Sequence, residues 1–294
     1  MDGDSAQDRE ASVLTIESGE RWGKEAAIGG LKRLSREDLS LIALTKAGFA
    51  GRYVQVMKSL VERLRGYAER QDEDVVHDFR TSVRRAQATV RLFPSELRRK
   101  RLTRKFLRCC RAAGKVSSQL RDIDIIKARL MKLPQSDPRD SFLSELDGRR
   151  LALLRDARRT AKALSRNLLK EEFDRGLNAK QLEKRFRKVA GRLVVDVDSR
   201  LAVVLEDATK KKELHLLRMD CKKLRYTLEA GRKTAYREKL LRTLEESSDA
   251  LGGIHDWDTV TAYLMEKPRR AEPLIELAAE KRDLEYQKFV KRAR

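Results

Sequence analysis

The sequence has 294 residues, and its 67 Lys and Arg against 46 Asp and Glu give a net charge of +21 at pH 7. A hydrophobic fraction of 40% supplies enough apolar material for a core, which excludes a wholly disordered chain. The chain contains no apolar run near the roughly 18 residues that a membrane span needs. Its three cysteines lack the spacing of a disulfide framework, which favours a reduced, cytoplasmic protein. The excess of positive charge predicts an anionic partner.

The charge is unevenly distributed along the chain. Residues 1–40 contain nine acidic and six basic residues, so the other 254 residues carry about +24. This first stretch has several glycines, no sustained hydrophobic period and no signal-peptide pattern. We expect a flexible acidic tail over residues 1–40.

The remaining sequence favours helices throughout. Only five prolines occur, and the segments between them are rich in Leu, Ala, Arg, Glu and Lys. The alternation of β-branched residues that is typical of strands is scarce. The pattern predicts an all-α protein built from antiparallel bundles with short connections. The expected helices span roughly 41–71, 73–92, 95–115, 120–132, 139–173, 179–209, 211–232, 235–251, 256–267 and 271–292.

Two segments of the chain repeat one another. Residues 75–93 read VVHDFRTSVRRAQATVRLF and residues 213–229 read ELHLLRMDCKKLRYTLE, each with a histidine followed by basic residues at +3, +7 and +8. The first copy consists of His77, Arg80, Arg84 and Arg85, and the second of His215, Arg218, Lys222 and Lys223. Such a repeat predicts a duplicated structural unit.

On a helical wheel, each copy has an apolar stripe of the kind that faces a core. A basic ridge lies beside each stripe, next to the histidine. The ridges contain Arg80, Arg84 and Arg91 in the first copy and Arg218, Lys222 and Arg225 in the second. Because like charges one turn apart repel, an anion along the ridge explains the pattern better than a solvated face. Tyr226 lies near His215 on the wheel, where its hydroxyl can reach a ligand, Glu229 or a neighbouring helix.

A second element follows each basic segment and contains an aspartate. Asp122 occurs in LRDIDI and Asp256 in IHDWDT. Two roles remain open for these aspartates. Each is either a helix N-cap, with its carboxylate accepting backbone N–H bonds, or the partner of a motif arginine or histidine.

A third basic element follows the first of the two repeated segments. Residues 98–121 contain ten basic residues and no acidic one. One helical face of this stretch carries Lys100, Arg104, Arg108, Arg111 and Lys115. This face is either solvated or part of the same anion site.

The paired motifs resemble those of the CHAD domain, an α-helical domain named for its histidines. Its first motif is close to H-D-x-R-x-x-x-R-R and its second to H-x-x-R-x-x-x-K-[KR]-x-R-Y-x-x-E. The residues that match here are His77-Asp78, Arg80, Arg84-Arg85, His215, Arg218, Lys222-Lys223, Arg225-Tyr226 and Glu229. The family's R-D-x-D and L-G-x-x-x-D elements are matched by Arg121-Asp122-x-Asp124 and by Leu251-Gly252 with Asp256. The sequence departs from the family at Gln87, where a basic residue is usual, and at His255, where a small polar one is usual.

The resemblance implies two four-helix bundles, over residues 41–175 and 176–294, related by a pseudo-twofold axis with a basic cleft between them. In the family this cleft binds inorganic polyphosphate, and bacterial members can sit on polyphosphate granules. We therefore expect a non-catalytic, cytoplasmic polyphosphate-binding protein, associated with granules and needing no cofactor or metal. The expected contacts are His77, Arg80, Arg84, Arg85, Arg91, Arg104, Arg108, Arg111, Lys115, His215, Arg218, Lys222, Lys223, Arg225 and Tyr226.

Three other classes of function compete with this prediction. A non-specific nucleic-acid binder fits the basic helices, although an aromatic fraction of 5% leaves few platforms for stacking bases. A metal phosphohydrolase is suggested by His77-Asp78 and His255-Asp256, but three histidines provide few further ligands. No phosphate-binding G-x-x-x-x-G-K-[ST] loop is present in the sequence. The third class is a scaffold whose basic cleft is incidental.

Overall fold

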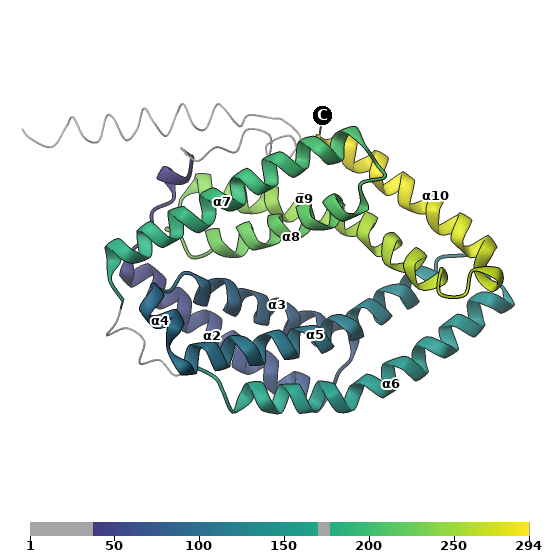
Figure 1. Ribbon diagram of the computed structural model, residues 1–294, viewed down its shortest axis with the longest axis horizontal. Helices are drawn as coiled ribbons and strands as arrows, with labels where there is room; N and C mark the ends of the chain where they lie inside the picture. The colour runs from purple at the N-terminus through teal and green to yellow at the C-terminus, as the bar shows by residue number, and fades with distance from the viewer. Residues whose placement is uncertain (1–37, 170–176, 294) are drawn as a thin grey trace, which may run out of the picture.

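The computed structural model describes residues 38–169 and 177–293 (Figure 1). Within these ranges every regular element is a helix and no strand occurs, which confirms the predicted all-α class. The short helix η2 (Asp38–Leu41) is followed by nine α-helices. They are α2 (Lys46–Glu69), α3 (Glu73–Arg91), α4 (Ser95–Arg99), α5 (Arg101–Leu130), α6 (Asp137–Ser165), α7 (Ala179–Glu206), α8 (Lys211–Leu228), α9 (Ala235–Leu264) and α10 (Pro268–Ala293).

Two predictions about organisation fall on residues outside the described ranges. The acidic tail predicted over residues 1–40 is undescribed as far as residue 37, and its last three residues belong to η2. The boundary predicted between residues 175 and 176 also lies outside the described residues. Both therefore stay predictions.

Side-chain caps fix where several helices begin. Thr45, Asp72, Asn178 and Thr234 precede α2, α3, α7 and α9, and each side chain accepts a hydrogen bond from the backbone N–H three residues later. Such caps satisfy one of the N–H groups that have no partner within the helix. Pro138 stands in the first turn of α6, where its missing N–H costs nothing.

Two interruptions predicted from the sequence, at 115–120 and 251–256, are wrong. Helices α5 and α9 each run unbroken for 30 residues across these positions. Ser117 and Leu120 are fully buried in α5, and Leu251 and Ile254 are buried on both sides of the Gly252-Gly253 pair in α9. Tertiary packing on one continuous face therefore overrides the weak local helix propensity.

The long helices form two groups that lie on opposite sides of the view in Figure 1. In the first group α2 packs on α3, α3 on α5, α5 on α6 and α6 on α2. In the second group α7 packs on α8, α8 on α9 and α9 on α10. The groups meet where α3 contacts α8, α5 contacts α9, and α6 contacts α10.

Apolar side chains join the two groups. One large cluster contains Phe79 and Phe106 from the first group together with Phe186 and Leu217 from the second, all fully buried. A smaller cluster joins α5, α6, α9 and α10 where these helices converge at one end of the molecule (Figure 1). Burial of this shared apolar surface stabilises the two groups together.

The internal repeat is also seen in two equivalent sets of arginine contacts, each with an aspartate and a backbone carbonyl oxygen, here called clamps. Arg150 of α6 donates from Nε to Asp124 of α5 at 2.8 Å and also donates to the carbonyl oxygen of Gln71, which follows α2. The equivalent contacts in the second group are made by Arg282, Asp258 and the carbonyl oxygen of Ala208. Each clamp ties the last two long helices of a group to the turn after its first helix, so the second aspartate of R-D-x-D and of H-D-W-D has a structural role.

Among the residues that the structure describes, no helix is long and apolar enough to cross a membrane.

Candidate functional site

A cavity of about 710 Å³, here called the central cavity, lies among α3, α5, α8 and α9. Both repeated motifs contribute to its lining. The expected contacts that line it are His77, Arg80, Arg84, Arg85, Arg218, Lys222, Arg225 and Tyr226. It is also lined by residues that were not predicted as contacts, chiefly Arg121, Arg129 and His255.

The apolar stripes of α3 and α8 orient the basic ridges toward this cavity. Val76, Phe79 and Val83 of α3 are buried in the core, as are Leu217 and Leu224 of α8. Because the ridge of each helix borders its buried stripe, the basic side chains are held at the edge of the core rather than free in solvent. The orientation that the apolar stripes predict for both helices is therefore confirmed.

Three of the cations in the central cavity are without partners. Arg84, Arg218 and Lys222, here called the unpaired set, form no hydrogen bond or ion pair with the part of the chain that the structure describes. Burial, together with the positive charges of Arg218 and Arg84, lowers the pKa of Lys222 to about 7. An anion bound beside these groups would relieve both the repulsion and the missing hydrogen bonds.

The arginines at the +3 positions differ in one respect. The Nε atoms of Arg80 and Arg218 are both buried without a partner among the described residues, but Arg80 also donates from Nη2 to the hydroxyl of Ser118 at 3.3 Å, whereas Arg218 makes no such bond. Gly252 occupies the place in α9 that Ser118 occupies in α5, four residues before the motif aspartate. A Cβ at Gly252 would lie 3.6 Å from the Arg218 Nε, in ordinary van der Waals contact, so the difference is that glycine offers the guanidinium no side-chain acceptor.

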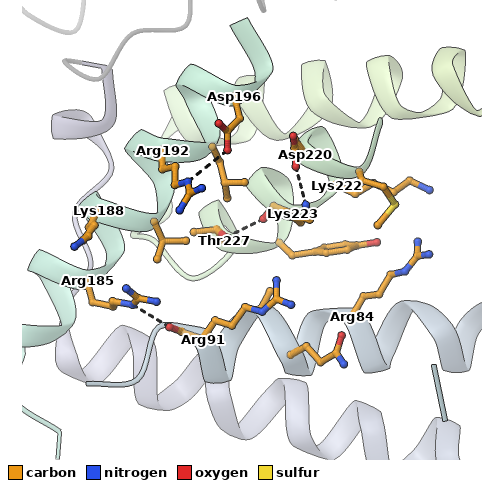
Figure 2. Close-up of a pocket in the computed structure, with 16 residues that line it drawn as sticks. Arg84, Arg91, Arg185, Lys188, Arg192, Asp196, Asp220, Lys222, Lys223 and Thr227 are labelled. Carbon is orange, nitrogen blue, oxygen red and sulfur yellow. Dashed lines mark hydrogen bonds and ion pairs between the residues drawn. The ribbon is translucent and has the colours of Figure 1, made fainter. Parts of the chain in front are cut away.

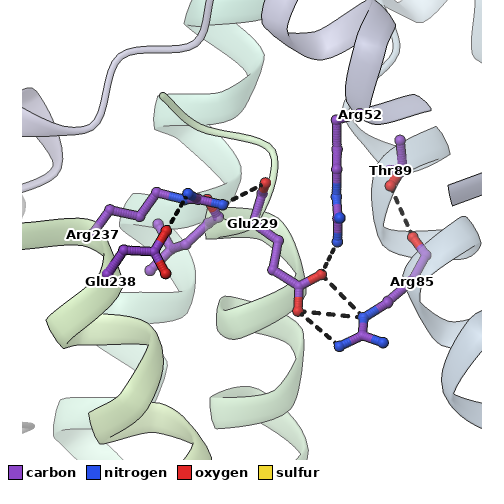
Figure 3. Close-up of polar contacts among 7 residues, drawn as sticks. Arg52, Arg85, Thr89, Glu229, Arg237 and Glu238 are labelled. Carbon is purple, nitrogen blue, oxygen red and sulfur yellow. Dashed lines mark hydrogen bonds and ion pairs between the residues drawn. The ribbon is translucent and has the colours of Figure 1, made fainter. Parts of the chain in front are cut away.

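Three neighbouring cations are neutralised by acidic partners. This paired set consists of Arg85, Lys223 and Arg225. Arg85 donates from Nε to Glu229 at 3.1 Å, and Glu229 also binds Arg52 (Figure 3).

The other two members of the paired set have one acidic partner each. Lys223 lies 2.7 Å from Asp220, and Arg225 pairs with Glu245. Each basic motif therefore contains residues with different local chemistry, although they are adjacent in sequence.

Tyr226 forms part of the cavity wall and is only 6% exposed. Its ring lies beneath the guanidinium groups of Arg85 and Arg225, at 5.6 and 5.2 Å from the ring centroid. Both contacts are cation–π interactions. The ring of the tyrosine therefore positions two arginines at the edge of the cavity, a role that the sequence did not predict.

All three histidines lie at or next to the central cavity. His77 and His255 line it, and His215 contacts His255 with their Nδ1 atoms 3.4 Å apart. Burial lowers the pKa of each histidine, and for His255 the value falls to about 3. Nearby positive charges contribute to these shifts, so the pKa of each histidine lies below its ordinary value of 6.5 and the neutral form predominates at pH 7.

The aspartates of the second element lie inside α5 and α9, so the predicted alternative of an N-cap is wrong for both. Asp256 pairs with Arg129 at 2.8 Å, and Arg129 also lies over the ring of Trp257. Burial raises the pKa of Asp122, while the charges of Arg80, Arg84 and Arg218 act in the opposite direction. Asp122 is thus the nearby acid that partly balances the motif arginines.

A second cavity of about 430 Å³ opens between α3, α7 and α8 and is here called the α7 groove (Figure 2). It contains two further expected contacts, Arg91 and Lys223. It also contains three cations that were not predicted, Arg185, Lys188 and Arg192 of α7. The signal for them was present, because residues 184–195 contain five basic residues and no acidic one.

The third basic element is only partly associated with these cavities. Arg111 and Lys115 join Arg80 and Arg84 in lining a cavity of about 270 Å³ between α3 and α5. Arg104 and Arg108 are exposed farther along α5 and line none of the cavities described here. The predicted basic face of α5 therefore reaches the site at its C-terminal end.

Among the described residues, no group of three or more His, Cys, Asp or Glu side chains is placed to hold a metal ion. The candidate site is therefore described by its cations and hydrogen-bond donors.

Comparison with known proteins defines the family and the class of this fold. The family model for the CHAD domain matches residues 55–265, and the chain belongs to the CHAD domain family. The crystal structure of the CHAD domain from the plant Ricinus communis is similar, with a TM-score of 0.61 and 16% identity over 84% of this chain and 87% of that chain. At this identity the likeness concerns the fold. The sequence matches no curated protein.

Proposed function

We propose that this protein binds inorganic polyphosphate without catalysis, in a basic cleft formed by the central cavity. The cleft would lie between two four-helix bundles, over residues 41–175 and 176–294, related by a pseudo-twofold axis. The observation that carries the proposal is the unpaired set, in which equivalent positions of two repeats supply cations that have no acidic partner among the described residues. Membership of the CHAD domain family, which is associated with polyphosphate, supports it.

The chemistry of the site suits a repeating phosphate chain. Polyphosphate carries about one negative charge per phosphate and no bases, so its recognition needs many cations and no stacking platform. Arg84 and Arg218 offer planar donor pairs to phosphate oxygens, and Lys222 offers a point charge. His77 and His255 can donate single hydrogen bonds. Binding in a cell would place the protein on polyphosphate granules.

Competition between polyanions tests the proposal. Labelled long-chain polyphosphate would be titrated with the protein and then displaced by unlabelled polyphosphate, duplex DNA or RNA at matched phosphate concentration. We expect polyphosphate to displace the label at a much lower concentration than either nucleic acid. Equal displacement by all three would favour non-specific nucleic-acid binding instead. Metal-dependent release of phosphate from the chain would contradict the non-catalytic part of the proposal.

A further inference from the structure

We propose that the α7 groove is a second anion subsite, through which a long polyphosphate chain leaves the central cavity on one side of the molecule. This inference rests on the proposed function and concerns the length of chain that the protein prefers. A chain too short to reach the α7 groove would bind only in the central cavity.

The two cavities lie next to one another. Arg84, Lys222 and Tyr226 line both of them, so an anion held by the unpaired set already lies at the entrance of the α7 groove. Figure 2 shows Arg84 and Lys222 at one end of this groove and Arg185 and Lys188 at the other.

The charge balance favours the α7 groove for further phosphates. The central cavity is lined by eight Lys and Arg and six Asp and Glu. The α7 groove is lined by seven Lys and Arg but only two Asp and Glu. Beyond the unpaired set, a phosphate chain therefore meets less repulsion toward α7 than toward the acidic residues of α9 and α10.

The cations that α7 adds are largely available to a ligand. Lys188 is exposed and forms no hydrogen bond or ion pair with any described residue. Arg185 donates only its Nε, to the carbonyl oxygen of Arg91 at 3.2 Å. Arg192 is 85% exposed and only loosely paired, with its Nε 3.8 Å from Asp196. Such long exposed contacts contribute little to stability, which leaves these side chains free to contact phosphate.

The internal repeat provides a comparison for this groove. Helices α2 and α7 align through buried residues, with Phe49 equivalent to Phe186 and Leu64 to Leu201. The groove equivalent to the α7 groove is a cavity of about 290 Å³ between α2, α3 and α8, here called the α2 groove. In this alignment, α2 has Gly48, Gly51 and Gln55 at the positions where α7 has Arg185, Lys188 and Arg192. The basic residues therefore belong to one repeat only.

The α2 groove is also blocked by an acid. Glu229 of α8 is equivalent to Arg91 of α3, and it binds the two arginines of the α2 groove, Arg52 and Arg85 (Figure 3). Equivalent positions therefore hold an anion, Glu229, that neutralises the α2 groove and a cation, Arg91, that adds to the positive charge of the α7 groove. This difference makes the exit of the phosphate chain one-sided.

The test is to measure how affinity depends on chain length. Tripolyphosphate and chains of about ten and about a hundred phosphates would be titrated into the full chain and into the variant R185Q/K188Q/R192Q. The matched control is R155Q/R158Q/K162Q, which removes two arginines and one lysine at the same spacing from the exposed face of α6. A second variant, Arg91→Glu, places in the α7 groove the acid that its counterpart has.

We expect the α7 variant to lose about 10- to 100-fold in affinity for the longest chain and less than about threefold for tripolyphosphate. The slope of log affinity against log salt should fall by about 2, for three lost phosphate contacts. Arg91→Glu should have the same length-dependent effect, and the α6 control should change no affinity by more than about threefold.

Equal losses for short and long chains, or a loss no greater than in the α6 control, would overturn the inference. In either case wild-type binding would still support the proposed function. If the wild-type protein binds no chain of any length, the proposed function itself fails. Thermal unfolding of each variant separates loss of binding from loss of folding.

Discussion

The unpaired set and the paired set differ in environment, although both consist of basic residues from the same two motifs on α3 and α8. Arg84 and Arg85 are adjacent, as are Lys222 and Lys223, yet the first of each pair has no partner and the second is bound by an acid. Successive residues point about 100° apart on a helix, so the second residue of each pair reaches an acid that the first does not reach. The acid is Glu229 for Arg85 and Asp220 of the same helix for Lys223. A run of basic residues therefore combines two roles, one in binding and one in holding helices together.

The two roles have opposite effects on the free protein. The unpaired set is half-buried and forms no ion pair with a described residue, and Asp122 offsets only part of its charge, which disfavours the folded state until an anion binds. Arg85 binds Glu229 at the end of α8, and Arg225 binds Glu245 of α9, so these two ion pairs join helices and stabilise the fold. Lys223 is neutralised within α8, by Asp220. Substitutions in the two sets should therefore change affinity and stability in different ways.

Removal of the unpaired set should abolish binding while leaving the fold intact. Replacing Arg84, Arg218 and Lys222 with Gln together removes three charge-assisted contacts, each worth about 1.5–3 kcal/mol. We expect a loss of about 1,000-fold or more in polyphosphate affinity, measured by titration. The melting temperature of the free protein should stay the same or rise, because mutual repulsion is removed. A large drop in melting temperature would show that these residues stabilise the fold.

Loss of Glu229, the acid that binds Arg85 of the paired set, should lower the stability of the free protein. Glu229→Gln leaves Arg52 and Arg85 without a counter-charge, and Glu229 is only 11% exposed. We expect a loss of about 1–3 kcal/mol in the free energy of unfolding, measured with urea. The comparison variant is Glu245→Gln, because Glu245 is 58% exposed and should cost no more than about 1 kcal/mol. Equal effects of the two substitutions would contradict the assignment of Glu229.

Binding should take up protons near neutral pH. The pKa of Lys222 is about 7 in the free protein, so this side chain is largely neutral above pH 8. Interior phosphates stay charged in this range and would raise the pKa of Lys222 in the complex. Affinity should therefore increase as pH falls from 8.5 to 6.5, by up to about tenfold per unit. The variant Lys222→Arg should weaken this dependence, because arginine stays charged.

The low pKa of Lys222 also determines how this residue makes the stability of the free protein depend on pH. Lys222 has a lower pKa in the folded state than its ordinary value of 10.5, so the unfolded chain binds more protons between about pH 7 and 10.5. The contribution of Lys222 to the free energy of unfolding therefore rises with pH across this window. In Lys222→Met this part of the pH dependence should disappear from urea unfolding measured without an anion. Persistence of the full dependence in that variant would contradict the low pKa.

The smallest effect should come from a cation that already has a partner. Lys223→Gln removes a charge that Asp220 already neutralises at 2.7 Å. We expect affinity for polyphosphate to change by less than about threefold, whereas Lys222→Gln should lower it by about tenfold. Titration of the two single variants side by side gives the comparison. Equal losses would show that pairing does not separate the two sets.

The sequence alone determined the helical class, the repeat and the facing of the two motif helices. A 3.6-residue period is local, so the wheel located Arg84 and Lys222 beside the apolar stripes without knowledge of the fold. The continuity of α5 and α9 was not predictable, because buried contacts with distant helices carry each helix through residues of weak propensity. The cations of α7 were missed because they lie outside the repeated motif.

The tertiary structure decided which basic residues are available to a ligand. Composition gave about +24 for the chain after residue 40, and the motifs placed part of this charge on two ridges. Whether a given cation is neutralised depends on an acid far away in sequence: Glu229 for Arg85, 144 residues away, and no such partner among the described residues for Arg84. Charge is a property of each residue, but its pairing is set by packing, and only packing distinguishes the cations that hold the fold together from those that face an anion.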